Sequence, residues 1–245
     1  DRRGEYSALN ALFYGTLADV KKMAEVKNDQ YNIDLVEEVR KGIKNKFTDH
    51  FYNQERGCYV DANIDGELST KISEHANMGA ILWELTNEEI TETIINNFYE
   101  KENIEYTEAQ PYYTTVVLQA LDRIHRFNLA LDIIYDRWGK RMVDRGASST
   151  FEEWGMNGSW RNGDFNGFLR SLSHAWSAHP AEFLICNLIG LEILEPGCKE
   201  IVLNPKEVDF DYEVVFPAPS GKVRVDKNGD KLDINVSGDI SISKS

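Results

Sequence analysis

Residues 7–47 read SALNALFYGTLADVKKMAEVKNDQYNIDLVEEVRKGIKNKF, and this stretch decides the fold class. Apolar side chains recur every three or four residues from Leu9 to Ala24, and again from Ile33 to Phe47. Such spacing predicts two amphipathic helices. The polar pair Asn28-Asp29 between them predicts a short loop, so the stretch is expected to form a helical hairpin.

Further helical hairpins are predicted downstream of the first. Ser73 and Asn87 are residue types that cap helix N-termini, and each precedes an apolar run at helical spacing. Pro111 fits the first turn of another helix, because the N–H that proline lacks would have no helical partner there. Asn128 is expected to open the helix that returns from it. Successive hairpins favour an α/α toroid over a solenoid, since no repeat of roughly 30–45 residues is visible.

The last part of the chain has a different pattern, with short β segments after Pro196-Gly197. Asn228-Gly229 lies between two alternating apolar runs, which is a strong signal for a β-hairpin. We therefore expect a mainly α protein of two parts. Residues 1–196 would form helical hairpins of a toroid, and residues 197–245 a small antiparallel β domain.

Composition narrows the classes of partner. The chain has 245 residues and a formal net charge of −14 at pH 7. Nucleic acid is not an expected partner, because no surplus of Lys and Arg is available to displace counterions from phosphates. No apolar run approaches the roughly 20 residues that a membrane helix needs, so no membrane partner is expected. The sequence leaves the localisation open. Its three cysteines include no CxxC pair, so neither a zinc site nor a disulfide framework is indicated.

The helical period is lost from Gly146 to Asn166, and long loops inside compact domains are usually functional. This loop contains the adjacent carboxylates Glu152 and Glu153 and the tryptophans Trp154 and Trp160. Indole faces pack on the C–H faces of sugars, while carboxylates and amides bind hydroxyls, so the composition suits a carbohydrate cleft. Taken alone, the same residues also fit solvated loop charges and tryptophans that cover the end of the helical core.

Hydrolysis of a glycoside needs a carboxylic acid and a second carboxylate, which in inverting enzymes lie about 6.5–9.5 Å apart. One loop does not supply both groups at that separation. The second carboxylate is therefore expected from another loop or from outside this sequence. His174, in the stretch SLSHAWSAHP (171–180), would by itself more often be a hydrogen-bonded structural histidine than a site residue.

Three consecutive segments resemble the bacterial α-L-rhamnosidase family in order and spacing: GASSTFEEW (146–154), SLSHAWSAHPAEFL (171–184) and GLEILEPGCKEIVLNP (190–205). The upstream segments SALNALFYGTLADVKKMAEV (7–26) and SEHANMGAILWEL (73–85) also fit the family's barrel helices, so the likeness spans the chain. The resemblance implies that residues 1–196 are the C-terminal part of an (α/α)6 six-hairpin barrel and that residues 197–245 form a small antiparallel β-sandwich domain. It also implies removal of terminal α-L-rhamnose from rhamnosides. It implies no cofactor.

By position, Glu152 matches the family's general base, the carboxylate that activates water in an inverting reaction. Phe151 replaces the usual aromatic residue before the base, and Glu153 lies where the family varies.

The other candidate site residues would bind substrate. His174 matches the histidine that binds a sugar hydroxyl in the −1 subsite, and Trp154 and Trp176 match residues of the same cleft. Trp160 and Glu153 join them as candidates because they lie in the same loop.

The front of the chain departs from the family. The family's general acid lies in an Arg-Asp-Glu-Arg-like motif that this sequence does not contain. We count seven barrel helices where the family's toroid has twelve, so about five helices and the acid are expected elsewhere. Exposed apolar helix faces would then favour a homodimer or packing against another segment of the same protein. The chain alone is expected to turn over poorly, since loss of a general acid costs on the order of 10²–10⁴-fold.

Two alternatives remain open. The first is a six-hairpin enzyme for another sugar, such as an unsaturated glucuronyl hydrolase. An acidic sugar would need basic residues in the cleft, for which Arg161 and Arg170 are the nearby candidates. A non-catalytic carbohydrate-binding or scaffolding piece would keep the tryptophans and lack the acid.

A calcium loop at 61–67 is not expected, because the spacing of its carboxylates is not that of an EF-hand.

Overall fold

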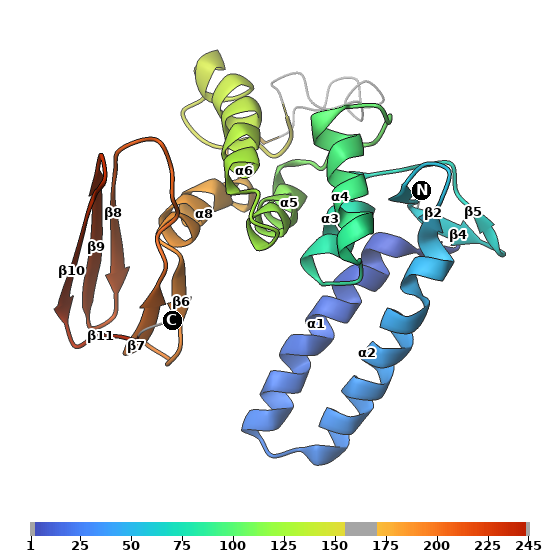
Figure 1. The fold of residues 1–245 in the computed structure, drawn as a ribbon, viewed down its shortest axis with the longest axis horizontal. Helices are drawn as coiled ribbons and strands as arrows, with labels where there is room; N and C mark the ends of the chain where they lie inside the picture. Colours follow the sequence, from blue (N-terminus) through green and yellow to red (C-terminus); the bar gives the residue numbers. More distant parts are fainter. Residues whose placement is uncertain (1–2, 155–170, 244–245) are drawn as a thin grey trace. The chain divides into compact units, whose positions relative to one another are not determined.

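The computed structural model describes residues 3–154 and 171–243. The chain divides into two compact units, Asp1–Arg126 (unit 1) and Phe127–Ser245 (unit 2). It is mainly helical, with small sheets, and this confirms the predicted fold class (Figure 1). The predicted domain boundary between residues 196 and 197 stays a prediction.

Unit 1 is built mainly from helices, the first two of which form the predicted hairpin. Asp29 and Asn87 cap their helices by accepting hydrogen bonds from backbone N–H groups three residues later, as does Ser73. Pro111 lies in the first turn of its helix, as predicted. The helices are α1 (Ser7–Val26), α2 (Gln30–Phe51), α3 (Glu74–Leu82), α4 (Glu88–Ile95), which continues as a π-helical turn over Asn96–Glu100, and α5 (Pro111–Arg123).

Helix α3 packs against both α1 and α5, and α1 packs against α2. The contact between α1 and α3 is close because Gly15 has no side chain: a Cβ atom there would lie 2.3 Å from Nε1 of Trp83. Any larger residue at this position would force the two helices apart.

Short strands join these helices. Strands β1 (Glu5–Tyr6), β4 (Ala62–Ile64) and β5 (Glu67–Leu68) form an antiparallel sheet in the order β1-β4-β5, and β2 (Tyr52–Asn53) pairs with β3 (Cys58–Tyr59). Asp65 and Gly66 both have positive φ and form the tight turn between β4 and β5. Strand β1 was not predicted, because two residues carry too little pattern.

Buried hydrogen bonds tie together the N-terminal ends of α1, α3 and α5. The backbone N–H of Ser7 donates to the carbonyl oxygen of Asp61 (2.9 Å), and Ser73 Oγ donates to Asp61 Oδ1 (2.6 Å). The fully buried Glu74 accepts from the Tyr99 hydroxyl (2.8 Å) and from the Ala109 N–H (2.6 Å). These contacts, which we call the unit 1 polar network, fix the three helix starts at one end of the unit.

Unit 2 begins with α6 (Phe127–Ile134), one residue before the predicted start at Asn128. It continues as a π-helical turn η2 (Tyr135–Lys140) and a 3-10 turn η3 (Val143–Arg145). After the loop come the 3-10 turn η4 (Ala175–Ser177) and α8 (His179–Leu188), with Pro180 in the first turn of α8.

Two three-stranded sheets complete unit 2. The first has the order β10-β9-β8 and is antiparallel throughout; its strands are β8 (Tyr212–Ala218), β9 (Gly221–Asn228) and β10 (Lys231–Gly238). Asn228 pairs with Lys231, so the predicted hairpin is confirmed with its two-residue loop at Gly229-Asp230. The second sheet, of order β11-β7-β6, consists of β6 (Leu191–Ile193), β7 (Glu200–Leu203) and β11 (Ser241–Ile242), with β11 and β7 parallel.

Candidate active site

The structure brings two of the resembling segments together in unit 2. We call residues 146–154 the Glu152 segment and residues 171–179 the His174 segment. The backbone N–H of His174 donates to the carbonyl oxygen of Thr150, and Thr150 Oγ1 donates to the carbonyl oxygen of His174, both at 2.8 Å. The N–H of Glu152 donates to the carbonyl oxygen of Ser171 at 2.9 Å. The two segments therefore lie side by side although about 20 residues separate them.

Glu152 is half-buried, and its carboxylate is oriented by the neighbouring segment. Its Oε2 atom accepts a hydrogen bond from the backbone N–H of Ser171 at 3.1 Å. A carboxylate held by a backbone N–H keeps a fixed direction and still has other lone pairs for a water molecule. The adjacent Glu153 is buried, with 8% of its surface exposed. Of the two adjacent carboxylates, Glu152 is thus the more accessible.

Trp154 lies in a hydrophobic cluster with Trp138, Met142 and Phe151. Its ring meets that of Trp138 edge-on, with centroids 4.7 Å apart and an interplanar angle of 88°. Only 8% of Trp154 is exposed, so the side chain anchors the Glu152 segment to the core. Its predicted part in substrate binding stays a prediction.

His174 and Trp176 form the aromatic surface of the site. Their rings are stacked, with centroids 4.1 Å apart and an interplanar angle of 18°, and 43% of Trp176 is exposed. An exposed indole face beside an imidazole suits a sugar, because the ring covers C–H groups and the imidazole bonds hydroxyls.

Trp138 and Ser177 join the two segments, and sequence reasoning did not identify either as part of a site. Trp138 Nε1–H donates to the carbonyl oxygen of Ser177 at 2.8 Å, and Ser177 Oγ donates to the carbonyl oxygen of Phe151. The side chains of Trp138 and Ser177 are both buried. The available signal was a tryptophan next to Gly139 at the end of a helical pattern, and a serine inside the SLSHAWSAHP stretch (171–180).

Some predictions fall outside the described residues. Trp160 lies there, as do the basic candidates Arg161 and Arg170. Within residues 3–154 and 171–243, no group of three or more His, Cys, Asp or Glu side chains is arranged to hold a metal ion. In the same part of the chain, no helix has the length and hydropathy to cross a bilayer.

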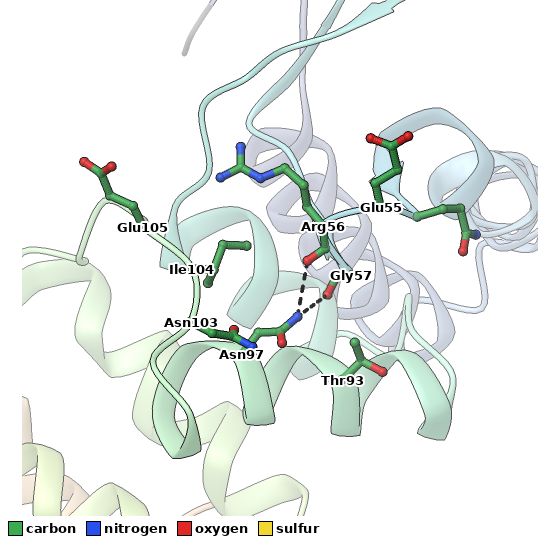
Figure 2. A pocket seen from close by; sticks show the side chains of 9 residues that line it. Glu55, Arg56, Gly57, Thr93, Asn97, Asn103, Ile104 and Glu105 are labelled. Carbon is green, nitrogen blue, oxygen red and sulfur yellow. Dashed lines mark hydrogen bonds between the residues drawn. The ribbon is translucent and has the colours of Figure 1, made fainter.

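Unit 1 contains a separate polar pocket of about 480 Å³ between the β2–β3 turn, α4 and the loop before α5. Figure 2 shows the Asn97 amide directed at two backbone carbonyls, those of Arg56 (3.2 Å) and Gly57 (3.3 Å). The Arg56 guanidinium is also engaged, because Nη1 donates to the carbonyl oxygen of Thr70 at 2.9 Å. None of the predicted site residues lines this pocket.

Comparison with protein families gives one match, over residues 4–188, to the bacterial alpha-L-rhamnosidase 6 hairpin glycosidase domain. A search of curated proteins found no match.

Solved structures of rhamnosidases share the fold. The GH78 family rhamnosidase of Bacillus sp. GL1 matches with a TM-score of 0.83 and 21% identity, over 97% of this chain and 26% of that chain. The Streptomyces avermitilis alpha-L-rhamnosidase complexed with L-rhamnose matches with a TM-score of 0.68 and 16% identity, over 95% and 22%. The Klebsiella oxytoca rhamnosidase with rhamnose bound matches with a TM-score of 0.59 and 22% identity, over 73% and 33%. The chain thus spans about a quarter to a third of these proteins.

Proposed function

This chain belongs to the bacterial alpha-L-rhamnosidase six-hairpin glycosidase family, and on that premise we propose that it is part of a glycoside hydrolase that removes terminal α-L-rhamnose. The observation that carries the proposal is the pairing of the Glu152 segment with the His174 segment. This pairing puts a carboxylate on one segment and an indole–imidazole pair on its neighbour.

In this proposal Glu152 is the general base of an inverting reaction. Its carboxylate takes a proton from water while the water oxygen attacks the anomeric carbon. The bond to the leaving oxygen breaks, and a general acid outside this sequence protonates that oxygen. The hydrogen bond from the Ser171 N–H supports Glu152 over Glu153, because it fixes one carboxylate oxygen and leaves the group half-exposed. The reaction needs no cofactor.

His174 and Trp176 would bind the sugar. L-Rhamnose presents an apolar face with a methyl group and an array of hydroxyls, which matches the half-exposed indole stacked on an imidazole. Two of the fold relatives contain rhamnose, which supports a rhamnoside as substrate here.

The test is hydrolysis of a panel of aryl glycosides, α-L-rhamnoside included, by the complete polypeptide and its Glu152→Gln variant. We expect release from the rhamnoside, reduced on the order of 10²–10⁴-fold in the variant because the base is lost. Glu192→Gln, at an exposed position of β6, is the matched control and should keep the activity, whereas Glu153→Gln tests the alternative base. If no glycoside is cleaved while sugar binding persists, the chain is a binding module; if Glu153→Gln is the inactive variant, the base is misassigned.

We also propose that the apolar face of α1 packs against a second copy of the chain. Leu9, Leu12 and Phe13 are 59%, 43% and 48% exposed, and their spacing puts them on one side of the helix. Sedimentation velocity of the wild-type protein should show a dimer. The double variant Leu12→Glu/Phe13→Glu should sediment as a monomer. Tyr135→Glu is the control, because Tyr135 is a large hydrophobic residue of unit 2 with 64% of its surface exposed. A wild-type monomer would contradict the proposal.

A further inference from the structure

His179 is the first residue of α8, and its imidazole lies at the junction of three elements. Its ring meets that of Trp138 edge-on, with centroids 5.1 Å apart and an interplanar angle of 88°. Its Nδ1 atom lies 3.3 Å from the carbonyl oxygen of Trp176. The side chain therefore links the end of α6 and η2 to the η4 turn that presents the aromatic pair.

The hydrogen bond fixes the tautomer of His179. A carbonyl oxygen only accepts, so Nδ1 must carry the proton and donate. Nε2 is buried and has no hydrogen-bond partner among the described residues, so in the neutral ring it is a bare acceptor. Protonation would put an N–H at this buried position, which is unfavourable. Burial correspondingly lowers the pKa of His179.

The contact matters because it holds the backbone of a residue whose side chain is exposed. The backbone of the neighbouring His174 makes two hydrogen bonds with Thr150, and 43% of the Trp176 surface is exposed. In η4, the carbonyl oxygen of Trp176 is held by the His179 ring and the next carbonyl, that of Ser177, by Trp138. These two bonds set the course of the backbone that directs the indole onto His174.

We infer that His179 is a positioning residue: its Nδ1–H holds the Trp176 carbonyl and thereby keeps the Trp176 indole stacked on His174 in the orientation that binds sugar. The inference deepens the proposed function and rests on it for the sugar-binding part alone.

The test uses the complete polypeptide labelled with 5-fluorotryptophan. Trp176→Phe assigns the Trp176 fluorine resonance, and Trp83 in unit 1 serves as an internal reference for folding. His179→Leu fills similar volume without a donor, and we expect the Trp176 resonance to shift or broaden while that of Trp83 stays unchanged. His179→Asn keeps an N–H near the position of Nδ1 and should restore most of the wild-type resonance. Cys186→Ser, two turns along α8, is the matched control.

The second readout is L-rhamnose affinity, followed by titration, together with kcat and KM for an aryl rhamnoside. Loss of one hydrogen bond predicts a Kd and KM about 3- to 10-fold higher in His179→Leu, with kcat within about twofold and rescue by Asn. A Trp176 resonance and an affinity equal to wild type in His179→Leu would overturn the inference. If the wild type binds no rhamnose, the proposed function fails, and the fluorine spectra still decide whether His179 orients Trp176.

Discussion

The helix starts of unit 1 and the paired segments of unit 2 are held in different ways. In unit 1, buried side chains such as Asp61 and Glu74 form hydrogen bonds with neighbouring elements. Several hydrogen bonds therefore fix the helix starts together. In unit 2, the candidate site is held by hydrogen bonds between two irregular segments and by the buried side chains of Trp138 and Ser177. Several polar side chains fix the helix starts of unit 1, whereas in unit 2 one aromatic ring, that of Trp138, contacts Trp154, Ser177 and His179.

Trp138→Ala gives the largest stability effect expected from this comparison. Removing the ring leaves a cavity between Trp154 and His179 and unpairs the buried carbonyl of Ser177. We expect a loss of about 3–5 kcal/mol in the free energy of unfolding, measured in urea. Trp176→Ala, which removes an exposed indole, should change stability by less than about 1 kcal/mol. Equal losses of unfolding free energy in the two variants would contradict the prediction that Trp138 stabilises unit 2 more than an exposed tryptophan does.

Glu74→Ala tests the unit 1 polar network. It removes the carboxylate that accepts from the Tyr99 hydroxyl and from the Ala109 N–H. The expected loss is about 1–3 kcal/mol in the same denaturation experiment, because removing the acceptor of buried hydrogen bonds costs this much. Glu67→Ala, at an exposed position of β5, is the control and should be close to neutral. A neutral Glu74→Ala would show that the network does not stabilise the helix starts.

Asn87→Ala removes an exposed helix cap from α4 and should cost about 1 kcal/mol. The matched control is Asn45→Ala, an exposed asparagine inside α2, where alanine's higher helix propensity predicts no loss. Thermal denaturation of both variants separates capping from the general effect of losing an amide. Identical melting temperatures would rule out a capping contribution.

The smallest effect concerns pH. Burial lowers the pKa of His179 below its ordinary value of 6.5, so the unfolded chain takes up a proton at a higher pH than the folded one. The stability from neutral His179 is fully present above about pH 6.5 and is lost as pH falls toward the folded pKa. Melting temperatures between pH 7.5 and 5 should fall more in the wild type than in His179→Leu. Parallel curves would exclude His179 as a source of the pH dependence.

The helices were predictable because their signals are local. The caps at Ser73 and Asn87 and the first-turn proline at Pro111 act within one turn of their own position, and all three are where the pattern places them. The hairpin at Gly229-Asp230 follows from the same kind of short-range preference. The two-residue strand β1 was missed, since it exists only because β4 offers it a partner.

The candidate site was predictable only in part. The Glu152 and His174 segments were identified by their resemblance to a family, and residue types alone left a structural explanation open. Sequence reasoning did not identify Trp138, Ser177 and His179 as part of a site. Each of these side chains bonds to a backbone carbonyl oxygen, and no sequence pattern marks such a contact.

By itself, then, the sequence determined where helices begin and end, because capping and periodicity are properties of neighbouring residues. It also provided the candidate carboxylate, imidazole and indole side chains of the site. Only the tertiary structure decided that Glu152 faces the Ser171 N–H, that Trp154 is a core residue and that Trp176 is exposed. Those outcomes depend on which distant segments meet, and that is set by packing of the whole unit rather than by any short stretch of chain.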